Sequence, residues 1–182
     1  MFGLFKKKEQ SLKITDRIWM SVSYKLKAFA EEWRKNKETV FIFWFDETLR
    51  EVETEMAKEI TEQPLLFTAR EVSASHITGK PVVFAEHYPL PQKENELFER
   101  LGLKEVKIWS ALNEPLFHRF GGEKIIQMMK TMGMKEEDPV EHAMISKAIR
   151  NAQEKIEKKM MLEQTAHSQK DWLQKNFPAE NA

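Results

Sequence analysis

Residues 110–157 read SALNEPLFHRFGGEKIIQMMKTMGMKEEDPVEHAMISKAIRNAQEKIE and contain the densest set of helix signals in this chain of 182 residues. They predict the end of a strand, a helical turn, a Gly-Gly break, a short apolar helix and a long amphipathic helix. Asp138 suits the N-cap of the long helix, Pro139 its first helical position, and Glu141 the carboxylate of a capping box. Gly133 lies where a left-handed residue would end the short helix. The stretch therefore predicts two helices joined by a sharp turn.

Upstream of this stretch, runs of apolar residues alternate with segments in which apolar residues recur at helical spacing. The unbroken runs, rich in β-branched and aromatic residues, predict buried strands near 40–45, 65–69, 82–87 and 105–110. The periodic segments predict helices at 21–35, 49–60 and 92–101. Strands that alternate with helices indicate a parallel sheet between two layers of helices. We therefore expect an α/β protein with four parallel strands in a three-layer arrangement.

The residues of the first stretch match the pattern of one family in order and spacing. The matching positions are Leu112, Pro115, Leu116, Arg119, Phe120, Gly121, Gly122, Met132, Gly133, Met134, Pro139, Val140, Glu141, His142, Met144, Lys147, Ala148, Ile149, Asn151, Ala152, Gln153, Lys155 and Glu157. This pattern resembles SecA, the motor ATPase of bacterial preprotein translocase, where its second nucleotide-binding domain ends and its helical scaffold begins. A weaker likeness extends upstream to residues 16–33, which resemble the entry to that second domain.

The resemblance implies a shortened and degenerate half of a P-loop NTPase of the RecA-like type, followed by part of a helical scaffold. It divides the chain into an N-terminal tip at 1–12, an α/β domain at 13–136 and a helical extension at 137–182. The scaffold helix of the family is long, so one continuous C-terminal helix is expected here from about Pro139 to Asn176.

Two features that ATP hydrolysis requires are missing from the sequence. No GxxxxGK[ST] phosphate loop is present, and Gly79-Lys80 is followed by proline. The arginine-rich helix that the family places after the third predicted strand is reduced to Arg100. Glu86 and Arg100 are therefore only vestigial candidates for nucleotide contact, and we expect no catalytic residue, no cofactor and no enzymatic activity.

The other groups of reactive side chains in the sequence give only weak indications of a functional site. Glu86 and His87 follow a predicted strand and could form an acid–base pair at the edge where α/β sheets bind ligands, although inherited structure accounts for them better. The five histidines show no metal-ligand spacing, and the absence of cysteine excludes disulfides, zinc–thiolate sites and a thiol nucleophile. A soft apolar patch in and after the short helix favours packing beneath the scaffold helix over an adaptable binding groove. Its members are Met128, Met129, Met132 and Met134.

The chain has 29 basic and 29 acidic residues, and this balance lacks the basic character typical of nucleic-acid-binding proteins. No apolar run approaches the roughly 20 residues that span a bilayer, and no signal peptide is recognisable, so a cytoplasmic location is expected. The N-terminal tip is apolar and then basic, which allows weak peripheral contact with anionic lipid, although a frayed terminus is the simpler interpretation. The residues concerned are Phe2, Leu4, Phe5, Lys6, Lys7 and Lys8.

The distal part of the predicted long helix has no apolar stripe until Trp172, Leu173 and Phe177. A straight helix of that length would carry these side chains beyond the parent sheet. We therefore expect them to contact a second protomer or another protein, or, after a bend near residues 165–168, the helix at 21–35. The first alternative makes all three side chains candidates for partner binding.

Together these observations favour a non-catalytic, SecA-related module that binds another protein and is linked to preprotein export. Its partner would be the export machinery or a second copy of the chain. Two alternatives stay open: a half-ATPase that completes a nucleotide site in trans with a partner's phosphate loop, and a plain structural or oligomerisation module. Retention of Arg100 favours the half-ATPase slightly, whereas loss of the neighbouring arginines opposes it.

Overall fold

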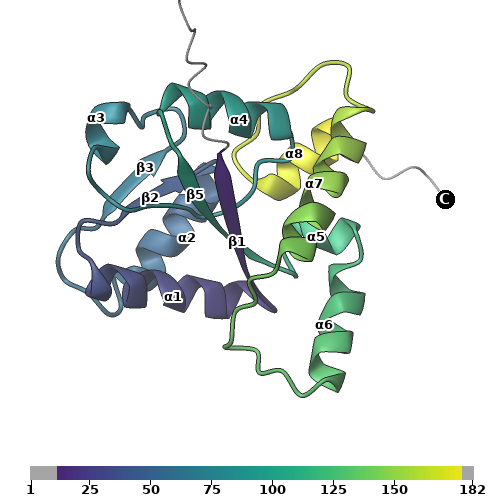
Figure 1. Cartoon of the computed structure of the whole chain (residues 1–182), viewed down its shortest axis with the longest axis horizontal. Coiled ribbons are helices and arrows are strands. Elements are labelled where there is room, and N and C mark those ends of the chain that lie inside the picture. The colour runs from purple at the N-terminus through teal and green to yellow at the C-terminus, as the bar shows by residue number, and fades with distance from the viewer. Residues whose placement is uncertain (1–11, 178–182) are drawn as a thin grey trace, which may run out of the picture.

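The computed structural model describes residues 12–177, which form one sheet of five parallel strands with helices on both faces. In sheet order the strands are β1 (Lys13–Trp19), β5 (Glu105–Ala111), β4 (Val82–Phe84), β2 (Val40–Phe43) and β3 (Leu65–Thr68). Helices α1 (Val22–Lys35) and α2 (Asp46–Met56) cover one face, and α3 (Ala74–Ile77) and α4 (Pro91–Arg100) cover the other (Figure 1). The predicted three-layer α/β fold is confirmed.

Aromatic side chains fill the core on both faces of the sheet. Under α1, the ring of Trp109 packs edge-to-face on Trp19 at a centroid distance of 5.1 Å and lies 4.9 Å from Phe29. On the opposite face, Phe84 packs edge-to-face on Phe98 of α4 at 5.0 Å. Such pairs add stabilisation beyond the burial of apolar area, so they fix the helices to the two faces.

The sequence prediction of four strands misses β1. This strand pairs with β5 along its whole length, from Lys13 opposite Glu105 to Trp19 opposite Ala111. Its sequence, KITDRIW, mixes charged and apolar residues because it lies at the edge of the sheet, where charges discourage pairing between molecules. A search for unbroken apolar runs detects central strands and overlooks an edge strand of this kind.

The prediction of a single C-terminal helix from 139 to 176 is wrong. Helix α7 spans Ala143–Glu157 and α8 spans Gln169–Asn176, and the residues between them are not helical (Figure 1). The turn brings Trp172 and Leu173 back onto the body of the protein, where both are buried. Burial of these two large side chains outweighs the helical hydrogen bonds that a straight continuation would add.

The start of α7 also differs from the prediction. Its N-cap is His142 rather than Asp138. Val140 explains the shift, because its N–H donates to the carbonyl of Ile18 at 2.8 Å and its carbonyl accepts the N–H of Ile18 at 3.0 Å. This antiparallel bridge on the outer edge of β1 holds the backbone extended, so the helix begins only at Ala143, three residues after Val140.

Two glycines shape the helices before α7, namely α5 (Pro115–Arg119) and α6 (Gly122–Thr131). Gly133 follows α6 with a φ of +76°, which confirms the predicted left-handed residue. Gly122 lies so close to the preceding loop that a Cβ atom there would be 2.1 Å from the carbonyl oxygen of Leu112. The Gly-Gly break is therefore a requirement of packing as well as of backbone conformation.

Within residues 12–177 every helix is too short or too polar to cross a membrane. The predicted lipid contact of the N-terminal tip concerns residues 2–8, which lie outside the described part of the chain.

Candidate functional site

The carboxyl ends of the parallel strands meet at one edge of the sheet, where α/β proteins bind ligands. Acidic residues follow two of these ends: Glu86 after β4 and Glu114 after β5. Of the two vestigial candidates that the sequence suggests, Glu86 therefore lies at this edge. What the edge can do depends on whether its polar groups are free or already satisfied.

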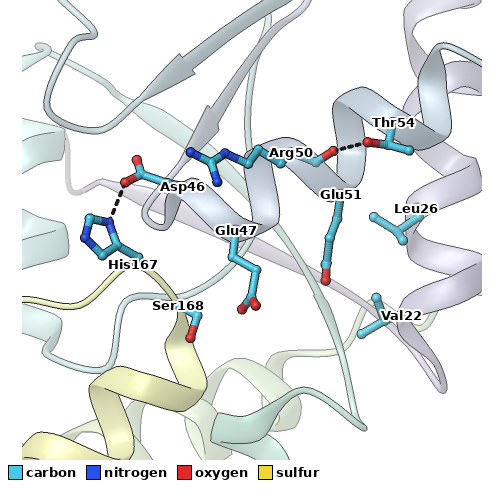
Figure 2. A pocket seen from close by; sticks show the side chains of 9 residues that line it. All are labelled: Val22, Leu26, Asp46, Glu47, Arg50, Glu51, Thr54, His167 and Ser168. Atoms are coloured by element: carbon cyan, nitrogen blue, oxygen red, sulfur yellow. Dashed lines mark hydrogen bonds and ion pairs between the residues drawn. The ribbon is translucent and has the colours of Figure 1, made fainter.

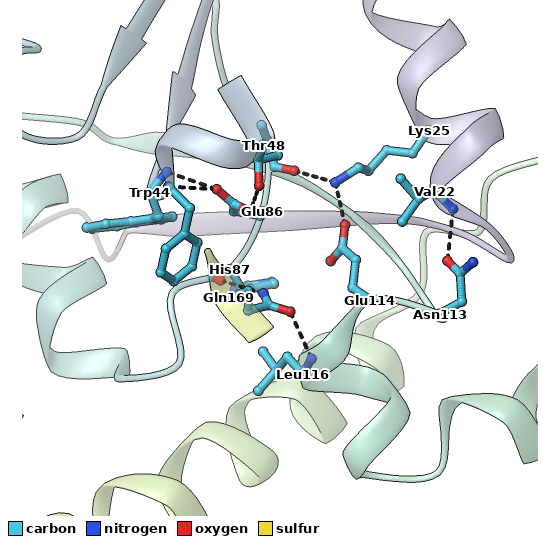
Figure 3. A network of polar contacts seen from close by, with 12 residues as sticks. Val22, Lys25, Trp44, Thr48, Glu86, His87, Asn113, Glu114, Leu116 and Gln169 are labelled. Atoms are coloured by element: carbon cyan, nitrogen blue, oxygen red, sulfur yellow. Dashed lines mark hydrogen bonds and ion pairs between the residues drawn. The ribbon is translucent and has the colours of Figure 1, made fainter. Parts of the chain in front are cut away.

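Glu86 is fully engaged in holding the start of α2. Its Oε1 accepts the backbone N–H groups of Trp44 at 3.1 Å and Phe45 at 3.0 Å, and its Oε2 accepts the hydroxyl of Thr48 at 2.5 Å (Figure 3). Burial raises the pKa of Glu86 to about 7, against the lowering effects of the nearby Lys25 charge and the Thr48 hydrogen bond. With three donors on one carboxyl group, the side chain stabilises the turn between β2 and α2.

Lys25 is a buried cation on the sheet-facing side of α1. Its Nζ donates to the carbonyl of Ala85 at 2.8 Å and to Oε1 of Glu114 (Figure 3). Burial raises the pKa of Glu114, and the charge of Lys25 opposes that rise. The ion pair ties α1 to the loop after β5, while the second carboxylate oxygen of Glu114 has no partner among the described residues.

His87 lies between two buried carboxylates. Its Nε2 is 2.9 Å from Oδ1 of Asp16 in β1, and its Nδ1 is 2.9 Å from Oε1 of Glu94 in α4. Burial alone would lower the pKa of His87, but the charges and hydrogen bonds of Glu94 and Asp16 raise it to about 10. Burial works to raise the pKa of Asp16, yet the hydrogen bond and charge of His87 bring it below its usual value. A protonated imidazole thus links β1, β4 and α4.

The suggested acid–base pair of Glu86 and His87 does not form, because each side chain is saturated by other partners. Both residues are only 2–3% exposed, and neither lines the hollows described below. A structural role therefore accounts for both side chains, in line with the alternative favoured by the sequence; whether that role is inherited from the family stays a prediction. Their chemistry is that of structural hydrogen bonds and ion pairs.

Two buried glutamines attach the C-terminal helices to this polar cluster. Gln153 of α7 donates to the carbonyl of Tyr88 at 2.7 Å and to Oε2 of Glu94 at 2.9 Å. Gln169 of α8 accepts the N–H of Leu116 at 2.8 Å and donates to the carbonyl of His87 at 3.3 Å (Figure 3). The protein's own α7 and α8 therefore cover the carboxyl ends of β4 and β5.

Trp172, Leu173 and Phe177, the partner-binding candidates, pack on their own chain. Trp172 is 0% exposed and Leu173 is 4% exposed, and Phe177 is half-buried beneath the guanidinium of Arg119, 4.6 Å from its ring. The surface that receives them consists of Phe45, Leu90, Leu116 and Ile156. The chain turns before α8, whose N-cap Ser168 accepts the N–H of Asp171 at 3.1 Å. Fold-back packing is observed, but onto this surface and not onto α1.

An open hollow of about 820 Å³ lies between α1, α2 and the start of α8 (Figure 2). It is lined by Val22, Leu26, Asp46, Glu47, Arg50, Glu51, Thr54, His167 and Ser168. The carboxylate of Asp46 lies 2.9 Å from Nδ1 of His167 and accepts a hydrogen bond from Nη2 of Arg70 at 2.8 Å. These contacts lower the pKa of Asp46. Desolvation in the hollow and the charge of Glu47 raise the pKa of Glu51. The hollow is therefore acidic on the α2 side.

A second hollow of about 440 Å³ lies where β2 and β3 end, beside α4. Its cationic side chains are Arg70, Lys93 and Arg100, and its aromatic ones include Trp44 and Tyr88. Nη2 of Arg100 donates to the carbonyl of Ala69 at 2.8 Å, which fixes the guanidinium at the rim. Arg100 lines this hollow and Glu86 does not, so the structure does not bring the two vestigial candidates into one site.

Sequence inspection missed most members of the buried polar cluster: Asp16, Lys25, Glu94, Glu114, Gln153 and Gln169. A signal existed for one of them, because Lys25 lies three and four residues from Val22 and Phe29, on the apolar face of α1. A charge on such a face predicts a buried ion pair. Among residues 12–177 no group of His, Asp or Glu side chains has the arrangement of a metal site.

Comparison with known proteins yields similarity over part of the chain. No protein-family model matches. Over 83 residues the chain is 31% identical to the protein translocase subunit SecA of Psychrobacter sp. (strain PRwf-1) and 32% identical to that of Psychrobacter cryohalolentis. The SecA of Acinetobacter baumannii (strain ATCC 17978) is also 31% identical over 83 residues. Each alignment covers 43% of this chain and 9% of the relative, so the chain is SecA-related in part of its sequence and spans a small fraction of those proteins.

Proposed function

We propose that this chain is a non-catalytic, SecA-related module that works in protein translocation by docking on another protein. The link to translocation is supported by the similarity to proteins named as protein translocase subunits. The module character is supported by the sequence, which has neither a phosphate loop nor the paired arginines of the resembled motor.

The structural observation that supports the non-catalytic role is that α7 and α8 cover the carboxyl ends of β4 and β5. In open α/β sheets the ligand lies outside the carboxyl ends of the strands. Here the space beyond β4 and β5 is taken by α7 and α8, which are held by Gln153 and Gln169 and by the buried Trp172. A nucleotide beyond these two strands would have to displace two helices and break a network of buried charges, whereas the hollow at the ends of β2 and β3 stays open.

The first experiment measures nucleotide handling by the purified chain. We expect no ATP hydrolysis above background and no heat of ATP binding in the micromolar range by titration calorimetry. A measurable turnover that follows the chain through several purification steps would contradict the non-catalytic role.

The docking surface that we propose is the hollow between α1 and α2. Glu47 and Glu51 face it without an ion pair among the described residues, and Val22 and Leu26 provide an apolar floor (Figure 2). A segment with Lys or Arg side chains and an apolar residue would complement this surface. Purified SecA from a bacterium that encodes this chain is the probe for the translocase.

Titration of SecA into the chain should give a micromolar dissociation constant. The double variant Glu47→Lys, Glu51→Lys should weaken it about tenfold or more, because charge reversal turns attraction into repulsion. Glu99→Lys is the matched control, since Glu99 is exposed on α4 and lies outside the hollow. Equal loss with the control variant, or no binding of SecA by the native chain, would contradict docking through this surface.

A second candidate, the half-ATPase acting in trans, is favoured by the second hollow. Arg70, Lys93 and Arg100 beside Trp44 and Tyr88 offer cations and flat rings to a nucleotide. If the chain bound ATP with a micromolar dissociation constant and Arg100→Ala abolished that binding, this candidate would replace the first. A plain oligomerisation module would instead show concentration-dependent mass in light scattering and no affinity for SecA.

A further inference from the structure

Helices α6 and α7 leave an apolar groove open between them, at the end of the molecule away from β3 (Figure 1). Its volume is about 100 Å³, and its walls include Ile125, Met129, Ile145 and Ile149. The sequence predicts that the methionines here pack beneath the scaffold helix. This is true of Met129, which is 6% exposed.

Other methionines on the same two helices are exposed to solvent. Met128 of α6 is 57% exposed, Met132 at the C-cap of α6 is 70% exposed, and Met144 of α7 is 74% exposed. These three side chains belong to the segments that form the groove but lie outside its lining. Exposed apolar side chains form contact surfaces in soluble proteins, and methionine adapts its shape to a partner. The groove and these three exposed methionines are named here the methionine groove. Their exposed apolar surface indicates that another segment binds there.

The charge beside the methionine groove is negative. The linker from α6 to α7 lines the groove through Val140, which pairs with Ile18 at the end of β1. Residues 135–141 of this linker read KEEDPVE. Glu136 pairs with Lys130 at 2.6 Å and Glu141 pairs with Arg17 at 2.5 Å, which leaves Glu137 and Asp138 without an ion pair among the described residues. An occupant with an apolar tip and adjacent lysines would match both the groove and the linker.

The first eleven residues of this chain have that composition. They read MFGLFKKKEQS, which is an apolar tip followed by Lys6, Lys7 and Lys8. They join β1 at its start, and Ile18 lies about 17 Å farther along the strand at 3.3 Å per residue. The six residues between Phe5 and Leu12 reach up to about 20 Å when extended. The tip can therefore return alongside β1 to the groove.

We propose that residues 1–5 dock in the methionine groove of their own chain, with Lys6–Lys8 beside the acidic linker. This contact is separate from the α1–α2 hollow, so it holds or fails independently of the function proposed above. It also gives the apolar tip a protein site in place of a lipid one.

Disulfide trapping tests the proposal directly, because the chain has no cysteine of its own. The pair Phe5→Cys, Met132→Cys should form an intramolecular disulfide under mild oxidation, at a rate independent of protein concentration. The pair Phe5→Cys, Met161→Cys is the control, since Met161 is 100% exposed and outside the groove. Docking should make the first pair react about tenfold faster or more, because it raises the effective concentration of the two thiols.

Equal rates for the two pairs would overturn the proposal, and so would a disulfide that forms only between chains, which would assign the groove to a second copy. Oxidation by hydrogen peroxide gives a readout without cysteines. Met128 and Met132 should oxidise several-fold more slowly than Met161, and the variant Phe2→Ser, Leu4→Ser should remove that protection. Protection that appears only with anionic phosphatidylglycerol vesicles would assign the groove to lipid and overturn the proposal.

Discussion

The carboxyl edge of the sheet contains buried charged side chains, whereas the methionine groove contains exposed apolar ones. At the edge, the charged side chains of Lys25, His87 and Glu94 are 1–3% exposed, and each has a buried partner: His87 bonds to Glu94, and Lys25 bonds to Glu114. In the groove, apolar side chains such as Met132 and Met144 are 70% and 74% exposed. The two regions meet at β1, which supplies Asp16 to the first and Ile18 to the second.

The difference shows which of the two regions is needed for the stability of the fold. A buried ion needs its partners in place, because an unpaired charge in the interior is costly, so the edge tolerates little change. An exposed methionine has no such requirement and leaves the groove free for a contact. We therefore expect substitutions at the edge to change stability and substitutions in the groove to change binding.

The largest effect is expected from His87→Gln. Removing the imidazolium leaves Asp16 and Glu94 buried near each other without the cation between them. Loss of one member of a buried ion network costs about 3–5 kcal/mol. Urea denaturation should show this decrease in the free energy of unfolding. His118→Gln is the control, because His118 is exposed, and it should change stability little. Similar stability of both variants would refute a structural role for the His87 network.

Trp172→Ala should come next, with a loss of roughly 3 kcal/mol for the cavity left by a fully buried indole. The indole N–H also donates to Glu163 at 2.9 Å, so that hydrogen bond disappears as well. The control is Met161→Ala, at a fully exposed position in the same C-terminal part. Thermal unfolding followed by circular dichroism measures both. An unchanged melting temperature for Trp172→Ala would favour the partner-binding alternative over fold-back packing.

An effect that is smaller per pH unit should appear in the dependence of stability on pH. The pKa of His87 is about 10 in the folded chain and ordinarily 6.5, so the folded state holds this proton more tightly. That stabilisation is complete below pH 6.5 and is lost as the pH rises towards 10, with a slope of at most about 1.4 kcal/mol per pH unit. Urea denaturation between pH 7 and pH 10 should show the decline, and His87→Gln should flatten it. A flat profile in the native chain would mean that His87 is neutral.

Much of the fold could be predicted from the sequence because its central strands are buried on both faces. Runs such as VFIF at Val40–Phe43 read as strands without any partner being known. The edge strand β1 and the break before α8 could not be predicted in that way. Both depend on distant contacts: the pairing of β1 with β5, and the burial of Trp172 against Leu90 and Leu116.

The candidate site was less predictable than the fold. Glu86 was identified from its place after a strand, but its role follows from the N–H groups of Trp44 and Phe45, which the sequence does not locate. His87 contacts residues 71 positions before it and seven after it, so no local spacing reveals the network. Buried charges are recognised from sequence only when they interrupt an apolar face, as Lys25 does.

The smallest effect is expected from Met132→Ala at the C-cap of α6, and it contrasts with Met129→Ala inside that helix. Met129 is 6% exposed and should cost about 2 kcal/mol or more, whereas Met132 is 70% exposed and should change stability by less than about 0.5 kcal/mol when residues 1–8 are deleted. In the full chain a docked N-terminal tip would cover Met132, so the same substitution should then cost more. The difference between the two backgrounds measures the coupling between tip and groove, since non-interacting sites give additive effects. Urea denaturation of the four proteins (both backgrounds, with and without Met132→Ala) provides the double-mutant cycle. A coupling free energy of zero would show that the tip does not contact the groove.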